Sequence, residues 1–299
     1  MKIKVIDGME NIRVDKFLSS SLNLSRNIIS KSKILVNGEE TKLSYKLKLD
    51  DIVEIEVIEK KELKIVENNI KIKTIYEDEY LAVVDKPYGI VVHPSETSND
   101  DSLVGSLVNK FEKLSDIDKL RPGIVHRLDK DTSGLIIIAK DNDTHLKLQE
   151  MFKSHNLEKV YLAILKGNFK YDKITVKSYI GRDKKNRKKM SSNTDKGRLA
   201  ISHFEKIKSN DKISLVKVSI ETGRTHQIRV HAKELNYPVL YDSLYTKDNN
   251  SKKRQQLHSY YLKFTHPITN NVIELKCEMP DDMIKTLKNF DLGDFDVRI

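Results

Sequence analysis

From Ile72 onward the chain is a succession of short apolar segments separated by polar turns, and this pattern limits the folds open to it. The segments have the length and the β-branched content of strands, and a few helical patterns lie between them. Their spacing is too irregular for a repeat array. We therefore predict an α+β domain on a mixed or antiparallel sheet, with strands in YLAVVDKP, GLIIIAK, KVYLAILKG and SLVKVSIE.

The first sixty residues follow a different pattern, two helices in tandem before a small sheet. Apolar residues recur at helical spacing from Val14 to Leu22, and Ser25 is placed to cap a second short helix. Asn37-Gly38 favours a tight hairpin turn, and the alternation from Val53 to Val57 is typical of a half-buried strand. The predicted organisation is an αα-β unit at 1–60, a charged linker at 61–71 and a larger domain at 72–299.

One helix of the larger domain is clear from its periodicity. Ile228, His231, Ala232 and Leu235 fall at i, i+3, i+4 and i+7 and predict one buried stripe. Arg229 lies off that stripe. A basic insert, residues 181–198, carries eight Lys or Arg residues, and we expect it to be a mobile loop that contacts phosphates or is merely solvated.

Charge and cysteine content exclude some classes of protein. Lys and Arg number 54 against 44 for Asp and Glu, and the net charge of +10 suits either a polyanionic partner or a Lys-rich soluble protein. Cys277 is the only cysteine, which excludes an intramolecular disulfide and a Cys-based zinc site. The chain starts without a signal-peptide pattern and has no apolar run of about 18 residues. We expect a cytoplasmic protein that does not enter a membrane.

The segment HRLDKDTSG, which precedes the apolar run Leu135–Ala139, admits three interpretations. An EF-hand loop counted from Asp129 would need a glutamate at its twelfth position, where Lys140 stands. A phosphoaspartate enzyme could use Asp129 as nucleophile and Asp131 as its acid partner, but such enzymes present the motif after an apolar strand. Here the strand follows the motif, and Ser133 and Gly134 are expected to turn the chain into it.

The third interpretation is that HRLDKDTSG closely resembles the signature of the RluA family of pseudouridine synthases. DKPYGIVVHP, KVYLAIL, ETGRTHQIRVHA and LHSYYLKFTHPIT resemble further family motifs in the same order. The resemblance covers residues 72–285 nearly throughout. The sequence departs from the family pattern at Asn236 and Tyr241, where glycine is common, and both changes concern local loop shape.

The first unit resembles an S4 RNA-binding domain, through RVDKFL, the Ser25-Arg26 pair and ILVNGE. Its expected helices carry several cations, among which we assign Lys16 and Arg26 to RNA binding. An ordinary solvated basic helix pair is the alternative.

The family chemistry makes sense of the residue types. Forming pseudouridine breaks the glycosidic bond from C1′ to N1, turns the uracil and joins C1′ to C5. Breaking this bond builds oxocarbenium-like character on the ribose, so a carboxylate near C1′ or the 2′ position can act as nucleophile, stabiliser or base. The resemblance assigns that role to Asp129. It also implies that Arg229 keeps Asp129 charged and that Tyr161 packs on the uracil and assists proton removal from C5.

The remaining substrate contacts are expected from two of the motifs. Arg127 resembles the residue that fills the gap left by a flipped nucleotide, with a structural ion pair as its alternative. We also assign substrate contacts to His126, Arg224 and Thr225. No metal or other cofactor is expected, because the reaction needs no redox change, and one cysteine excludes a zinc deaminase.

We therefore interpret the chain as an RNA pseudouridine synthase that acts as a monomer on structured RNA, with large-subunit (23S) ribosomal RNA or its precursor favoured over transfer RNA. The alternative is a catalytically silent RNA-binding factor for ribosome assembly. Intact Asp129, Tyr161 and Arg229 argue against that alternative. The choice of uridines, and the choice between a nucleophilic and a glycal route, are open at the level of sequence.

Overall fold

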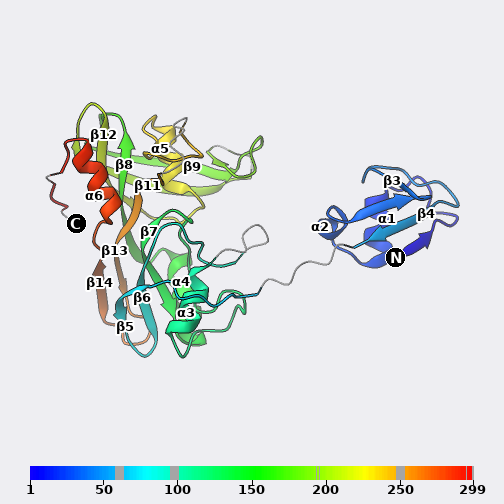
Figure 1. Ribbon diagram of the computed structural model, residues 1–299, viewed down its shortest axis with the longest axis horizontal. Helices are drawn as coiled ribbons and strands as arrows, with labels where there is room; N and C mark the ends of the chain where they lie inside the picture. The colour runs from blue at the N-terminus through cyan, green and yellow to red at the C-terminus, as the bar shows by residue number, and fades with distance from the viewer. Residues whose placement is uncertain are drawn as a thin grey trace. The chain divides into compact units, whose positions relative to one another are not determined.

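The chain divides into two units, Met1–Glu62 and Leu63–Ile299, which we describe separately. The structure is a computed structural model (Figure 1). It describes residues 1–57, 64–94, 101–192, 194, 196–246, 253–293 and 295–297.

The first unit contains the two expected helices, α1 (Val14–Leu22) and α2 (Arg26–Ile29). The Ser25 hydroxyl accepts a hydrogen bond from the Ile28 N–H at 3.4 Å, so Ser25 caps α2 as predicted. Lys16 and Arg26 are exposed on these helices.

The sheet of the first unit is antiparallel in the order β1-β4-β2-β3. Asn37 and Gly38 connect two of its strands, and their φ angles of 54° and 88° are those of a tight hairpin turn. Val53 and Ile55 are buried whereas their neighbours are not, which confirms the alternation. The strands are β1 (Lys2–Lys4), β2 (Lys33–Val36), β3 (Glu39–Glu40) and β4 (Ile52–Glu56).

The second unit is built on one ten-stranded sheet in the order β10-β9-β11-β12-β8-β13-β7-β6-β5, with β14 paired to β13. All neighbours are antiparallel except β13 and β7, so the predicted mixed α+β sheet is confirmed. The strands are β5 (Lys73–Glu77), β6 (Leu81–Lys86), β7 (Ser133–Ala139), β8 (Leu157–Lys166), β9 (Lys173–Arg182), β10 (Met190–Ser191), β11 (Arg198–Ser209), β12 (Ile213–Ile220), β13 (Leu257–Thr265) and β14 (Val272–Lys276).

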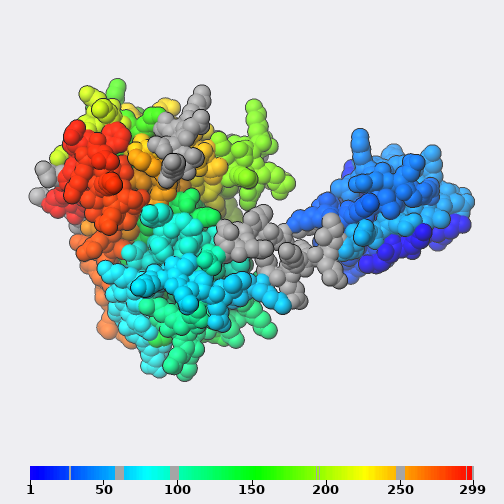
Figure 2. Space-filling model, viewed as in Figure 1, coloured from blue at the N-terminus to red at the C-terminus, as the bar shows by residue number. Residues whose placement is uncertain are grey.

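Helices cover both faces of this sheet, which explains why its central strands are continuous apolar runs. Along β7, Ile136 and Ile138 pack in one core cluster with helix α3, while Leu135 and Ile137 pack in another with α4. Helix α5 joins the α3 cluster, and α6 covers the other face of β8 and β12 (Figure 1). The four helices are α3 (Leu103–Lys110), α4 (Asn142–Ser154), α5 (Gln227–Glu234) and α6 (Asp281–Asn289). In Figure 2 the segment from α6 onward (red) lies on the outside of this unit.

Helix α5 carries the predicted stripe, but its burial extends further. Ile228, His231 and Ala232 are buried, as expected. Arg229, which the periodicity placed off the stripe, is only 5% exposed, because it points toward carboxylates rather than solvent.

Gly134 lies within β7 and does not form the turn expected before that strand. Its φ angle is 110°, and a Cβ atom there would lie 2.2 Å from the Ser259 carbonyl oxygen. Ser259 is its register partner on β13, so the missing side chain allows the parallel strands to approach.

The basic insert is more ordered than the expected loop. Met190 and Ser191 form β10, which pairs with β9 through Arg182 and Gly181. Met190 also packs against the cluster that contains Tyr245, an apolar contact that the composition of the insert did not indicate.

The second half of the expected linker packs on the second unit. The Asn68 side chain donates to the Ser102 carbonyl at 2.9 Å, and its backbone N–H donates to the Gly105 carbonyl at 3.4 Å. Asn236 and Tyr241 are the positions where the family pattern has glycine. They adopt φ angles of 66° and 60°, the left-handed conformation that glycine adopts most readily. Among the described residues, no helix has the length and apolar content needed to cross a membrane.

Substituting Gly134 tests whether close approach of β7 and β13 holds the sheet together. We expect Gly134→Ala to lower the free energy of unfolding by about 3 kcal/mol, because its Cβ meets backbone atoms and the positive φ adds strain. Urea unfolding measures this change. Gly223→Ala is the matched control, since no atom lies within 4 Å of its Cβ position. Equal stability of the two variants would contradict the assignment.

Candidate active site

Asp129 lies on a loop that is fixed from two sides before the chain enters β7. On one side, the Lys86 ammonium donates to the Lys130 carbonyl at 3.0 Å, and the Gly89 N–H donates to the same oxygen at 2.9 Å. On the other side, the Gln255 amide donates to the Thr132 hydroxyl at 2.8 Å. The loop is therefore held by segments that follow β6 and precede β13.

Lys86 is fully buried, and its charge is satisfied by backbone oxygens. It also donates to the Pro87 and Ile90 carbonyls, at 2.8 and 2.9 Å. Burial lowers the pKa of Lys86 to about 7. Three carbonyl acceptors match the three donors of the ammonium, so this lysine ties the Asp129 loop to β6.

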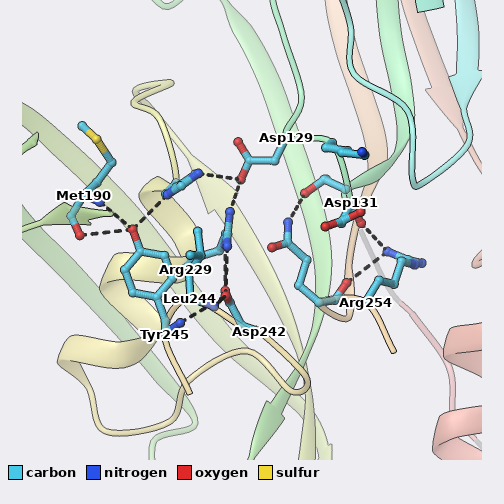
Figure 3. A network of polar contacts seen from close by, with 12 residues as sticks. Asp129, Asp131, Met190, Arg229, Asp242, Leu244, Tyr245 and Arg254 are labelled. Carbon is cyan, nitrogen blue, oxygen red and sulfur yellow. Dashed lines mark hydrogen bonds and ion pairs between the residues drawn. The ribbon is translucent and has the colours of Figure 1, made fainter. Parts of the chain in front are cut away.

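Arg254 supports the other end of the loop. Its guanidinium donates to the Asp131 carbonyl at 3.0 Å and forms a bidentate pair with Asp282 at 2.8 and 2.9 Å. The pair with Asp282 links the loop to helix α6. Figure 3 shows Arg254 beside Asp131.

Arg229 bridges two carboxylates at the centre of the site (Figure 3). Its Nη1 donates to Asp129 Oδ2 at 2.8 Å, while Nε and Nη2 donate to Asp242 Oδ2 and Oδ1 at 2.7 and 2.9 Å. The Asp242 side chain has no exposed area. The hydrogen bonds and charges of these carboxylates outweigh burial and raise the pKa of Arg229, so the cation is permanent.

The second oxygen of Asp129 is left for a ligand. Within the described part of the chain, Oδ1 has no hydrogen-bond partner, whereas Oδ2 is held by Arg229. The Asp129 side chain is 20% exposed. A carboxylate anchored through one oxygen and open through the other is suited to nucleophilic, electrostatic or base chemistry.

Tyr161 lies on β8 with only 8% of its surface exposed. Burial raises the pKa of its hydroxyl to about 12, and the Asp129 carboxylate adds to the rise. The phenol is therefore neutral near pH 7.

A second polar chain approaches Asp129 through His226, which adopts a φ of 55° before α5. His226 Nδ1 lies 2.9 Å from the Tyr245 hydroxyl, which also contacts the Met190 N–H and carbonyl at 2.8 and 3.1 Å (Figure 3). Nε2, the other ring nitrogen of His226, lies 3.9 Å from Asp129 Oδ2, and burial lowers the pKa of His226.

Six of the nine residues assigned from the sequence line one cavity of about 110 Å³. The cavity therefore combines a carboxylate, a phenol and several cations with an apolar wall that includes Leu128, Ile220 and Leu257. The six are Arg127, Asp129, Tyr161, Arg224, Thr225 and Arg229.

The other three residues lie elsewhere. His126 Nε2 accepts the Ile137 N–H at 2.8 Å, and its ring stacks on Phe152 with centroids 4.4 Å apart. Burial lowers the pKa of His126 to about 3, in keeping with a neutral ring that supports β7. Lys16 and Arg26 belong to the first unit.

The sequence did not identify several residues that organise the site. Asp242, which follows Tyr241, was assigned no role, although it fixes Arg229. Gln227 binds the Arg224 N–H at 3.0 Å and the Thr222 hydroxyl at 2.7 Å, which shapes the loop before α5. The signals available in the sequence were Lys86, a lysine next to an apolar run, and Asp242, an aspartate outside the recognised motifs. Neither residue type specifies the partner that it contacts in the folded protein. Among the described residues, no group of three or more His, Cys, Asp and Glu could hold a metal ion.

Comparisons with known proteins identify the family of this chain. A family model described as RNA pseudouridylate synthase matches residues 80–234, a span that includes Asp129, Tyr161 and Arg229. The Bacillus subtilis protein named "Uncharacterized RNA pseudouridine synthase YlyB" is 37% identical over 297 residues, covering 96% of this chain and 97% of that protein. Ribosomal large subunit pseudouridine synthase D of Borreliella burgdorferi is 41% identical over 228 residues, covering 75% of this chain and 70% of that protein.

Solved structures support the fold. The human protein RNA Pseudouridylate Synthase Domain Containing 4 matches with a TM-score of 0.60 at 22% identity, over 76% of this chain and 95% of that chain. The human protein RNA Pseudouridylate Synthase Domain Containing 1 matches with a TM-score of 0.59 at 24% identity, over 74% of this chain and 87% of that chain.

Removing the central cation tests the energetics of the site. Arg229→Met leaves Asp242 buried without its charged partner, so we expect the free energy of unfolding to fall by about 3–5 kcal/mol. Adding Asp242→Leu should recover most of that loss, because an apolar pair replaces the unmatched carboxylate. Chemical denaturation of the single and double variants measures both steps.

Arg121→Met is the matched control. Its guanidinium is 49% exposed and pairs with Asp118 at 2.8 Å, so its removal should cost less than about 1 kcal/mol. If Arg229→Met were as mild as this control, the buried bridge would not have the importance we give it.

Proposed function

Because this chain belongs to the family of RNA pseudouridine synthases, we propose that Asp129 is its catalytic carboxylate and that Arg229 and Tyr161 act with it on one uridine held in the cavity. The observation that carries this proposal is the Asp129 carboxylate, anchored through Oδ2 and open at Oδ1 beside a buried phenol. The reaction is the isomerisation of uridine to pseudouridine in RNA.

The role of Asp129 follows from where charge develops. Cleaving the C1′–N1 bond makes the ribose electron-poor, and a carboxylate close to C1′ stabilises that state or attacks it. The same oxygen can instead remove the 2′ proton on a glycal route, so the arrangement serves both routes. The leaving uracil stays bound and recombines, which is why no second carboxyl group is needed to protonate it.

Arg229 positions Asp129 through a direct ion pair at 2.8 Å. Because Asp242 takes two of the guanidinium donors, the third contact reaches Asp129 from a fixed direction. A carboxylate held in this way loses little freedom when substrate binds.

Tyr161 supplies a wall and a hydroxyl. Its ring forms part of the cavity that would hold the uracil, and its neutral phenol is placed to assist removal of the C5 proton after the new bond forms. Arg127 is exposed at the cavity and, in this proposal, fills the space left by the flipped nucleotide, while Arg224 and Thr225 contact the substrate.

Structured RNA of the large ribosomal subunit is the substrate that we propose. Relatives named ribosomal large subunit pseudouridine synthase D, together with the net charge of +10, support this choice. The first unit would bind RNA as an S4 domain does, through exposed cations such as Lys16 and Arg26. The enzyme would then act as a monomer in the cytoplasm, on the RNA or its precursor. A silent assembly factor would not need the open carboxylate.

Asp129→Asn tests the catalytic assignment, because it keeps the size of the side chain and removes its charge. We expect tritium release from C5-labelled uridine in ribosomal RNA to fall below about a hundredth of the parent rate, the usual cost of losing such a catalyst. RNA affinity in filter binding should stay nearly unchanged, since binding is spread over many basic contacts.

Asp131→Asn is the control, because Asp131 is two residues away on the same loop and its carboxylate does not line the cavity. It should retain most of the activity. Tritium release by Asp129→Asn above the hundredth level would remove Asp129 from the catalytic role.

Tyr161→Phe separates the proton-transfer step from bond cleavage. The ring and its packing remain, and only the hydroxyl is lost, so we expect loss of the C5 proton to become rate-limiting. Replacing the C5 hydrogen of the substrate with deuterium should then slow Tyr161→Phe more than it slows the parent enzyme. Tyr179→Phe, a change at a 56% exposed ring, should behave as the parent does. An isotope effect equal to that of the parent would contradict this role.

A further inference from the structure

A second cavity adjoins the proposed uridine cavity and has a different chemical character. Its volume is about 350 Å³, and five residues, among them Arg127, Tyr161 and Arg224, line both cavities. Its remaining walls come from the segment before Asp129, the end of α4 and the start of β8. A group bound in the second cavity would therefore lie directly beside the uridine.

Lys159 is the unusual residue of this cavity. It lies two residues before Tyr161 on β8, so both side chains are on the same face of the sheet. Lys159 is only 6% exposed, and its ammonium lies over the Phe152 ring at 5.7 Å from the centroid. In the part of the chain that the structure describes, no hydrogen-bond acceptor or carboxylate contacts this ammonium.

Lys86, the other buried lysine described above, differs from Lys159 in its contacts. The Lys86 ammonium donates to three carbonyl oxygens, whereas among the described residues the Lys159 ammonium contacts only the face of the Phe152 ring. Burial, together with a smaller effect of the nearby Arg224, lowers the pKa of Lys159 to about 8. A buried cation without an acceptor costs free energy in the free protein.

The other charged groups of the cavity are also cations. Among the residues that the structure describes, no Asp or Glu lines it, while Arg127, Lys153 and Arg224 do. Arg127 has no hydrogen bond or ion pair within the described residues, and Arg224 uses its Nε to bind the Leu199 carbonyl at 2.9 Å. His126 is neutral because its Nε2 accepts the Ile137 N–H. The cavity is thus positive, with several donors that lack acceptors.

We infer that this cavity is a phosphate-binding subsite, in which Lys159 with Arg127 and Arg224 holds a phosphodiester group of the nucleotide next to the target uridine. The inference rests on the proposed function, because it takes the first cavity to be the uridine site. A phosphate has enough acceptor oxygens for the ammonium and both guanidinium groups. Binding it would also remove the cost of the unpaired buried charge.

The subsite has a consequence for specificity. A phosphate fixed beside the Tyr161 ring sets the position of the ribose between the two cavities, and so brings C1′ toward Asp129. Such a contact recognises the RNA backbone and carries no base sequence.

Salt dependence of RNA binding tests the phosphate contact. The probe is a transcribed large-subunit ribosomal RNA fragment on which the parent enzyme releases tritium. Each phosphate neutralised by a cation contributes about 0.7–0.9 to the slope of log affinity against log salt. We expect Lys159→Met to reduce the slope by about that amount and Lys159→Arg to restore it.

Lys147→Met is the matched control, because it removes an equal charge from an exposed pair with Asp143 at 2.8 Å. It should leave the slope unchanged. Thermal unfolding provides a second readout, since Lys159→Met should be at least as stable as the parent if the lysine is kept for a ligand. A lower melting temperature together with an unchanged slope would make Lys159 structural and overturn the inference.

Neutral linkages identify the phosphate itself. In a synthetic stem-loop of the same fragment, methylphosphonate replaces one linkage at a time beside the modified uridine. The parent should lose affinity at one linkage, and Lys159→Met should lose less affinity at that linkage than the parent does, because only Arg127 and Arg224 still contact the phosphate there. Additive losses at every linkage would overturn the subsite. Since this test requires a parent that modifies the fragment, inactivity of the parent would instead refute the proposed function.

Discussion

The bridge that Arg229 makes between Asp129 and Asp242 is the contact on which the site depends. One guanidinium faces two carboxylates, and Asp242 takes two of its donors at 2.7 and 2.9 Å. The remaining donor holds Asp129 through Oδ2, so the negative charge that the bridge does not neutralise lies at the open oxygen. The fully buried Asp242 thus orients the partly exposed Asp129 through Arg229.

The sheet makes this arrangement possible because its central strands are covered on both faces. On β8, Tyr161 points toward the α5 side while Leu162 and Ile164 pack beneath α6. The Asp129 loop is tied to β6 through Lys86 and to the segment before β13 through Gln255. Asp129 is therefore held by a loop with two anchors, while Tyr161 and Arg229 are held by the regular elements β8 and α5.

Local patterns were sufficient to predict the strands, the hairpin at Asn37-Gly38 and the stripe on α5, because these depend on neighbours within a few residues. Long-range partners could not be predicted in this way. Asp242 is 13 residues from Arg229 along the chain, and nothing in its local sequence specifies that pairing. The insert around Met190 was expected to be a loop, because its composition hides one apolar contact with Tyr245 that exists only in the folded protein. The motifs located the chemistry, and tertiary packing determined its geometry.

Lys86 and Lys159 are buried cations that form no direct ion pair with a carboxylate among the described residues. Both lysines have lost water, and for both the charged form is disfavoured by burial. Lys86 regains its hydrogen bonds within the protein, so its role is complete in the free enzyme. Lys159 forms no such bonds among the described residues, and it lines a cavity that adjoins the one containing Asp129. An anion bound there would compensate its buried charge. A phosphodiester group of the RNA backbone would supply this anion when a uridine enters the neighbouring cavity. Recognition of the backbone would then be coupled to alignment of the base.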